Sequence, residues 1–182
     1  MGNATPEVEV RDARPDDAEA LARIYNAAIA ARTATFETEP RTAAERRAWL
    51  AGHDGRHPVL VAVRGGRVVA FASVDAYRSR ACYAGIGEYS VYVAEGARGQ
   101  GVGRVLLGAL IERCAALGYW KLLSRVFPEN VASRALCRSL GFREVGVYER
   151  HGRLDGRWRD CVIVERLLPA AFEEGAADPH GD

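Results

Sequence analysis

Hydrophobic positions recur along this chain with two periods, and each period predicts a different kind of element. Leu21, Ile24 and Ala28 recur at helical spacing after Asp16, a residue type common at helix starts, so we predict a helix there. Residues 58–63 form a continuous apolar run, which favours a buried strand. The two patterns alternate along the chain and predict helices that pack on a sheet.

The whole pattern predicts seven strands and four helices. The strands begin at residues 8, 58, 68, 88, 121, 145 and 158, and the helices begin at residues 16, 43, 102 and 130. Gly65-Gly66 and Asp155-Gly156 have the composition of two-residue hairpin turns, which join antiparallel strands. The later strand–helix–strand order indicates a parallel stretch. We therefore expect an α+β or α/β chain with a mixed sheet.

Composition supports a single domain. The chain has 182 residues, of which 48% are hydrophobic and 27% are charged. We place the domain at residues 7–170, between flexible ends at 1–6 and 171–182. Lys and Arg number 25 against 24 Asp and Glu, so no nucleic-acid partner is expected. No apolar run approaches the roughly 20 residues that cross a bilayer, and no secretory signal is present, so we expect no membrane contact and a cytoplasmic location.

Cysteine and histidine spacing predicts no metal site. The cysteines are Cys82, Cys114, Cys137 and Cys161. None forms a CxxC pair, so we expect reduced intracellular thiols rather than zinc ligands. His53 and His57 are four residues apart, but the glycines and the proline around them predict a loop rather than a helix face.

The most informative segment is a glycine-rich turn between a predicted strand and a predicted helix. Gly99, Gly101 and Gly103 allow the backbone to turn tightly and to approach a ligand closely. Amides at a helix start favour anions, and Arg98 and Arg104 add positive charge, so a phosphate or a pyrophosphate is the expected ligand. A P-loop is excluded because no Lys follows, and the GxGxxG spacing of dinucleotide folds fails. A ligand-free connection is the alternative.

A family resemblance follows from two motifs. Arg98-x-x-Gly101-x-Gly103, after a Val-Tyr-Val strand, resembles the acetyl-CoA signature of the GNAT family of N-acetyltransferases. Asn130-x-x-Ser133, followed by Leu-Gly-Phe at 140–142, is similar to that family's second landmark. The element order matches over about residues 8–168. The resemblance implies a mixed, mostly antiparallel sheet of about seven strands with about four helices on both faces, and acetyl-CoA as co-substrate.

The resemblance also implies which residues hold the coenzyme. These residues are Val91, Tyr92, Val93, Arg98, Gly99, Gln100, Gly101, Val102, Gly103, Arg104, Asn130 and Ser133. The turn amides would hold the diphosphate, and the preceding strand would hold the pantetheine arm and the thioester. For Asn130 the alternative is a helix N-cap with Ser133 at the third position, and both roles are compatible.

Two residues are candidates for proton transfer. An amine must lose a proton before it attacks a thioester, which calls for a base. Glu88 resembles the general base of a subgroup of the family, the phosphinothricin N-acetyltransferases, although a solvated carboxylate at a strand end is the alternative. Cys137 stands where many members have a Tyr and the subgroup often has a His. A thiol has a pKa of about 8.5 and could protonate the leaving thiolate, but inert packing is the alternative.

Three more segments resemble that subgroup, at residues 35–40, 77–83 and 156–160. They imply that Phe36, Arg78, Arg80 and Tyr83 bind the acceptor. If Arg78 and Arg80 lie on one strand, they share a face and suit a substrate with two anionic groups. The alternatives are a solvated strand edge for the arginines and core packing for Phe36.

The resemblance implies acetylation of the α-amine of a small oxyanion-bearing amino acid, such as phosphinothricin or methionine sulfoximine, with resistance as the consequence. Another acceptor (a polyamine, an aminoglycoside or a protein N-terminus) and a non-catalytic CoA-binding module are the alternatives. The C-terminal hairpin, which contains Trp158, lies near the dimer contact in relatives, so we expect a homodimer.

Overall fold

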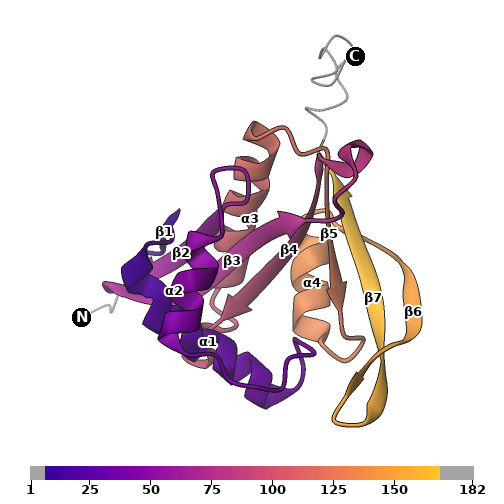
Figure 1. The fold of residues 1–182 in the computed structure, drawn as a ribbon, viewed down its shortest axis with the longest axis horizontal. Coiled ribbons are helices and arrows are strands. Elements are labelled where there is room, and N and C mark those ends of the chain that lie inside the picture. Colours follow the sequence, from indigo (N-terminus) through magenta and orange to yellow (C-terminus); the bar gives the residue numbers. More distant parts are fainter. Residues whose placement is uncertain (1–6, 169–182) are drawn as a thin grey trace.

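The computed structural model describes residues 7–168, so the predicted ends at 1–6 and 171–182 lie outside the described residues. Figure 1 shows one twisted sheet with helices on both faces. In chain order the elements are β1 Glu9–Asp12, α1 Ala18–Ala31, α2 Ala43–Ala51, β2 Val59–Arg64, β3 Arg67–Ala76, β4 Ile86–Val93, α3 Val102–Ala116, β5 Lys121–Val126, α4 Val131–Ser139, β6 Arg143–Leu154 and β7 Arg157–Leu167.

The sheet has the strand order β1-β2-β3-β4-β5-β7-β6. Neighbouring strands are antiparallel except β4 and β5, which are parallel. The predicted fold class, a mixed and mostly antiparallel sheet with helices on both faces, is therefore confirmed. Residues Gly65-Gly66 and Asp155-Gly156 form the predicted hairpin turns, and all four have positive φ, the conformation that such turns require.

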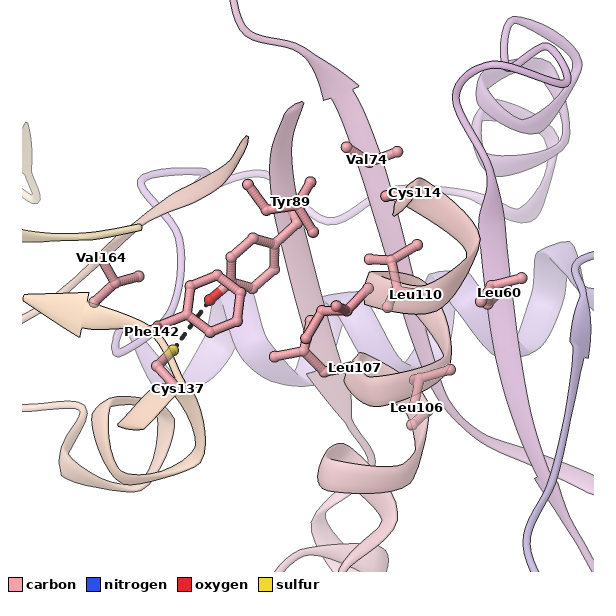
Figure 2. Close-up of a cluster of buried hydrophobic side chains, with 14 of the residues drawn as sticks. Leu60, Val74, Tyr89, Leu106, Leu107, Leu110, Cys114, Cys137, Phe142 and Val164 are labelled. Carbon is pink, nitrogen blue, oxygen red and sulfur yellow. Dashed lines mark hydrogen bonds between the residues drawn. The ribbon is translucent and has the colours of Figure 1, made fainter. Parts of the chain in front are cut away.

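Successive side chains of a strand point to opposite faces of the sheet, so the core has two layers. Phe71 of β3 packs with Leu21 and Ile24 of α1 on one face of the sheet. Its neighbours Ala70 and Ala72 point to the other face, where they pack against α3. Figure 2 shows part of this second layer, in which leucines of α3 meet side chains of the sheet. The two layers hold β4 and β5 at the centre of the molecule.

The structure corrects one prediction about the β3–β4 connection. Arg78 and Arg80 do not lie on a strand, because β3 ends at Ala76 and residues 77–80 form an irregular loop. Ala76 is the last β3 residue paired with β4, and the chain must then reverse to form the antiparallel pair. The argument that the two arginines share a strand face is therefore wrong.

All four cysteines are free thiols, and three of them are buried. In the part of the chain that the structure describes, no three His, Cys, Asp or Glu side chains come together as metal ligands. No helix within residues 7–168 is long and apolar enough to span a bilayer.

Candidate active site

The site forms where the two parallel central strands separate. β4 and β5 pair at only three positions, and Glu88 opposite Leu123 is the last of them. Both strands continue beyond that point, β4 to Val93 and β5 to Val126, without pairing to each other. The divergence opens a gap in the middle of the sheet, and three adjoining cavities lie along it.

The first cavity has a volume of about 410 Å³ and lies at the open end of the gap. It is lined by Ala28, Thr33, Ala34, Val91, Tyr92, Val93, Ala97, Arg98, Gly99, Gly101, Val102, Gly103, Arg104, Asn130, Ala132, Ser133 and Leu136. This set includes every residue that the family resemblance implied for the coenzyme except Gln100. The structure thus brings the glycine-rich turn, the end of β4 and the start of α4 to one cavity.

The turn presents backbone amides to this cavity. Gly99 and Gly101 have φ of 71° and 79°, a left-handed conformation that favours glycine. Gly101 is the N-cap of α3, and no side chain caps the helix. The first amides of a helix have no partner within the helix and carry partial positive charge. An uncapped helix start beside a large cavity suits a diphosphate.

Two side chains of the turn have defined partners. Arg98 donates from Nε to the Val93 carbonyl oxygen at 3.1 Å, which ties the turn to the end of β4. The Gln100 side chain donates to the Gly96 carbonyl oxygen at 2.8 Å and accepts from Arg64. The Gln100 side chain is therefore held by the protein itself and does not line the cavity.

Asn130 links two parts of the first cavity. Its Oδ1 accepts from the Ser133 backbone N–H at 3.1 Å, which is the capping bond of α4. Its Nδ2 donates to the Thr33 carbonyl oxygen at 3.1 Å. The capping role therefore exists in the structure, and contact between Asn130 and a coenzyme stays a prediction.

A second cavity, of about 60 Å³, lies in the gap between β4 and β5. It is lined by Tyr89, Ser90 and Val91 from β4 and by Ser124 and Val126 from β5, among others. It shares lining residues with the cavities on either side. The three cavities form a continuous series through the sheet.

Cys137 of α4 lines the second cavity and is 3% exposed. Its Sγ lies 3.0 Å from the hydroxyl of Tyr89, and the dashed line in Figure 2 marks this hydrogen bond. Burial raises the pKa of the Cys137 thiol, and burial also raises the pKa of the Tyr89 hydroxyl well above its usual range. Both groups are therefore protonated at neutral pH, so they can donate protons into the small cavity.

The third cavity has a volume of about 470 Å³. It is lined by Tyr25, Ala34, Thr35, Phe36, Glu37, Glu88, Tyr89, Ser90, Tyr92, Ser124, Arg125, Phe127 and Cys161. Phe36 packs edge-on against Phe127, with ring centroids 4.9 Å apart, so it both lines the cavity and packs in the protein. Of the four residues assigned to the acceptor, only Phe36 lines this cavity.

The other three predicted acceptor residues lie elsewhere. The Tyr77 and Tyr83 rings meet edge to face, with centroids 5.8 Å apart. Arg78 stacks on the Tyr77 ring, and Arg80 is exposed in the same loop. None of Arg78, Arg80 and Tyr83 lines any of the three cavities. These three residues therefore share no cavity with Glu88.

Glu88 lies on β4 where the pairing with β5 ends, and it faces the third cavity. Its side chain is 25% exposed, and its Oε1 accepts from Nε of Arg125 at 2.7 Å and also from Nη2 of the same guanidinium. Sequence reasoning missed Arg125. The available signal was a charged residue inside a predicted central strand, which requires a partner because unpaired charge is costly to bury.

Comparison with known proteins agrees with this geometry. Residues 21–142 match the model of the acetyltransferase (GNAT) family. The chain is 37% identical over 168 residues to a phosphinothricin N-acetyltransferase of Streptomyces coelicolor, which covers 90% of this chain and 98% of that protein. It is 36% identical over 161 residues to an L-methionine sulfoximine/L-methionine sulfone acetyltransferase of Pseudomonas aeruginosa, covering 87% and 94% of the two chains.

A solved structure is similar throughout. The crystal structure of a phosphinothricin acetyltransferase from Sinorhizobium meliloti in complex with acetyl-CoA superimposes with a TM-score of 0.83 at 33% identity. The match covers 88% of each chain.

Proposed function

Because this chain belongs to the acetyltransferase (GNAT) family, and is therefore an acetyl-CoA-dependent N-acetyltransferase, we propose that its acceptor is the α-amine of a small oxyanion-bearing amino acid. Phosphinothricin and methionine sulfoximine are the candidates, by analogy with the relatives named for them. The observation that carries the proposal is the position of Glu88. Glu88 lines the third cavity beside its neighbours Tyr89 and Ser90, which also line the small central cavity, at the point where β4 and β5 separate.

The first cavity fits acetyl-CoA, which supplies an activated acetyl carbon when bound. The amides at residues 99–103 and the uncapped start of α3 would hold its diphosphate. The end of β4, at Val91 to Val93, pairs with β3 but not with β5, and its backbone would hold the pantetheine arm on that free side. The thioester end would then lie in the gap between β4 and β5, on the side of Glu88.

Protons move at two positions in this proposal. Glu88 accepts the proton of the acceptor's ammonium, through a water molecule, which frees the nitrogen lone pair to form the new N–C bond as the C–S bond breaks. The backbone amide near Val91 donates a hydrogen bond to the carbonyl oxygen as that oxygen gains negative charge. Cys137 would donate its proton to the leaving thiolate, and the second proton that the acylated nitrogen releases would restore the thiol.

Replacing Cys137 with alanine tests its proposed role as the proton donor to the leaving thiolate. We expect kcat to fall about tenfold while the Kd for acetyl-CoA changes less than about twofold, because water can replace the donor only partly. A proton donor must be protonated, and burial raises the pKa of Cys137, so wild-type kcat should decline only above the ordinary thiol value of about 8.5. Steady-state kinetics between pH 6 and about 10 measure both effects.

The matched control is Cys114→Ala in α3, which removes another buried thiol that lines none of the three cavities. This control should keep the wild-type kcat and pH profile. A Cys137→Ala enzyme with full kcat and an unchanged alkaline limb would show that the thiol only packs.

The charges of the third cavity favour an amino-acid acceptor over a polyamine or an aminoglycoside. Its two carboxylates, Glu37 and Glu88, are each paired with an arginine, Arg41 and Arg125 respectively. A polycation would need unpaired negative charge in the cavity. The pairing of both carboxylates therefore argues against cationic acceptors.

An acetylation screen that detects released CoA thiol tests the proposed acceptor. We expect turnover with phosphinothricin or methionine sulfoximine, and little with spermidine, kanamycin or a peptide N-terminus. Turnover with one of the latter three but with neither amino acid would contradict the proposed substrate. Tight binding of acetyl-CoA without turnover of any amine would instead favour a non-catalytic module.

We also propose a homodimer in the cytoplasm, with resistance to the toxic amino acid as the result of acetylation. β6 is a long edge strand, and the β6–β7 hairpin exposes about half of the side chains of Val145, Val147, Tyr148 and Trp158. Apolar side chains on an exposed sheet edge favour a protein partner, and free thiols favour a reducing compartment. Sedimentation at the mass of one chain, or recovery of the protein outside the cytoplasm, would contradict these proposals.

A further inference from the structure

Arg125 is the arginine that the structure places in the acceptor cavity. It lies on β5, two residues beyond the last pair with β4, and it lines the second and third cavities. Its side chain is 46% exposed, so a small molecule can reach it. The two arginines expected from the sequence, Arg78 and Arg80, line neither cavity.

The contact between Arg125 and Glu88 leaves both groups able to bind a ligand. Nε and Nη2 of the guanidinium both donate to Oε1 of Glu88. Within residues 7–168, Oε2 accepts no hydrogen bond from another side chain or the backbone. Nη1 lies 3.5 Å from Nε2 of His151, at the outer limit of a hydrogen bond. The cavity therefore contains a free carboxylate oxygen beside a guanidinium with unused donors.

This pair has the charge pattern that complements an α-amino acid. An α-amino acid carries an ammonium and a carboxylate on one carbon, so its opposite charges are as close together as those of Glu88 and Arg125. A guanidinium binds carboxylates with two parallel hydrogen bonds, which fixes orientation as well as position. We propose that Arg125 binds the acceptor's α-carboxylate and thereby places the α-amine against Glu88.

The proposal rests on the proposed function and adds a selectivity rule to it. An acceptor with a carboxylate can replace both halves of the Glu88–Arg125 contact, because its amine meets Glu88 and its carboxylate meets Arg125. An amine without a carboxylate must compete with Arg125 for Glu88 and leaves the guanidinium without an anionic partner. The enzyme should therefore discriminate against acceptors whose carboxylate is masked.

Kinetics with Arg125→Gln test the rule on two acceptors, L-methionine sulfoximine and its carboxamide. We expect wild type to prefer the free carboxylate by about 10- to 150-fold in kcat/KM, since a hydrogen bond to a charged group is worth about 1.5–3 kcal/mol and each 1.4 kcal/mol is about tenfold. Arg125→Gln should lose about that factor on the carboxylate, mostly through KM, and change less than threefold on the carboxamide.

Arg113→Gln is the matched control. Arg113 is 43% exposed and pairs with Asp12 on the neighbouring β1, and it lines none of the three cavities. The Arg113→Gln variant should keep the wild-type kcat and KM for both compounds. The Kd for acetyl-CoA should be unchanged in both variants, because Arg125 does not line the coenzyme cavity.

If Arg125→Gln lowered kcat/KM by the same factor for both acceptors, or for neither, the assignment of Arg125 would be overturned. If wild type acetylates neither these compounds nor phosphinothricin, the proposed substrate fails, and L-methionine and L-glutamate with their carboxamides then replace the pair. If wild type prefers those amino acids over their carboxamides and Arg125→Gln does not, the role of Arg125 is supported although the proposed substrate has failed. Absence of turnover on every α-amino acid would refute both proposals.

Discussion

Replacing Glu88 with glutamine is expected to lower kcat by about 10²- to 10³-fold, because a positioned general base contributes about that factor. Glutamine keeps the size of the side chain and its hydrogen-bonding oxygen but cannot accept the proton of the ammonium. Binding of acetyl-CoA should be unaffected, since Glu88 does not line the coenzyme cavity. Stability should change little, because the contact with Arg125 is partly exposed to solvent.

The matched control for this prediction is Glu144→Gln. Glu144 is 29% exposed, and it pairs with Arg134 and Arg138 outside the three cavities. Its replacement should keep kcat within about threefold of wild type, as expected for a surface pair. If Glu88→Gln turned over the acceptor as fast as Glu144→Gln, a different group would be the base.

Replacing Gly101 with valine is expected to weaken acetyl-CoA binding about 100-fold. Gly101 has φ of 79°, where an L-residue costs about 1–2 kcal/mol, and a β-branched side chain is especially unfavourable there. Relief of this strain rotates the amides at the start of α3 away from the diphosphate, and one lost hydrogen bond to a charged group costs about 1.5–3 kcal/mol. A total of about 3 kcal/mol corresponds to about 100-fold in Kd, which calorimetric titration measures.

Gly108→Ala in the same helix is the control. Gly108 lies in the interior of α3, and an added Cβ would meet no atom within 4 Å. Alanine there should stabilise the helix by about 0.5–1 kcal/mol and leave binding unchanged. Wild-type affinity in Gly101→Val, with the fold intact by circular dichroism, would show that the turn does not hold the diphosphate.

Local patterns allowed most of the fold to be predicted from sequence. Hairpin turns such as Gly65-Gly66 depend only on the φ that those residues can adopt. The α3 stripe that includes Leu106 and Leu110 follows from helical periodicity, because the residues that pack on the sheet recur every three or four positions. The glycine-rich turn was found for the same reason, since the groups proposed to bind the ligand are its own amides.

Contacts between distant strands could not be predicted in this way. Glu88 and Arg125 are 37 residues apart, and they meet only because β4 and β5 are parallel neighbours that separate beyond Glu88. For Arg78 and Arg80, in contrast, the sequence predicted a shared strand face that the structure does not contain. Their two-residue spacing favoured a shared face only under the assumption of a strand, and β3 ends before them. Strand order and strand ends are tertiary properties, and local residue patterns determine them weakly.

A crystal structure of this chain with acetyl-CoA bound tests the central claim most directly. We expect the diphosphate within hydrogen-bond distance of the amides of residues 99–103, and the thioester carbonyl in the gap between β4 and β5, facing Glu88. A coenzyme bound elsewhere, or a turn occupied by one of the protein's own side chains while the coenzyme is present, would contradict the account.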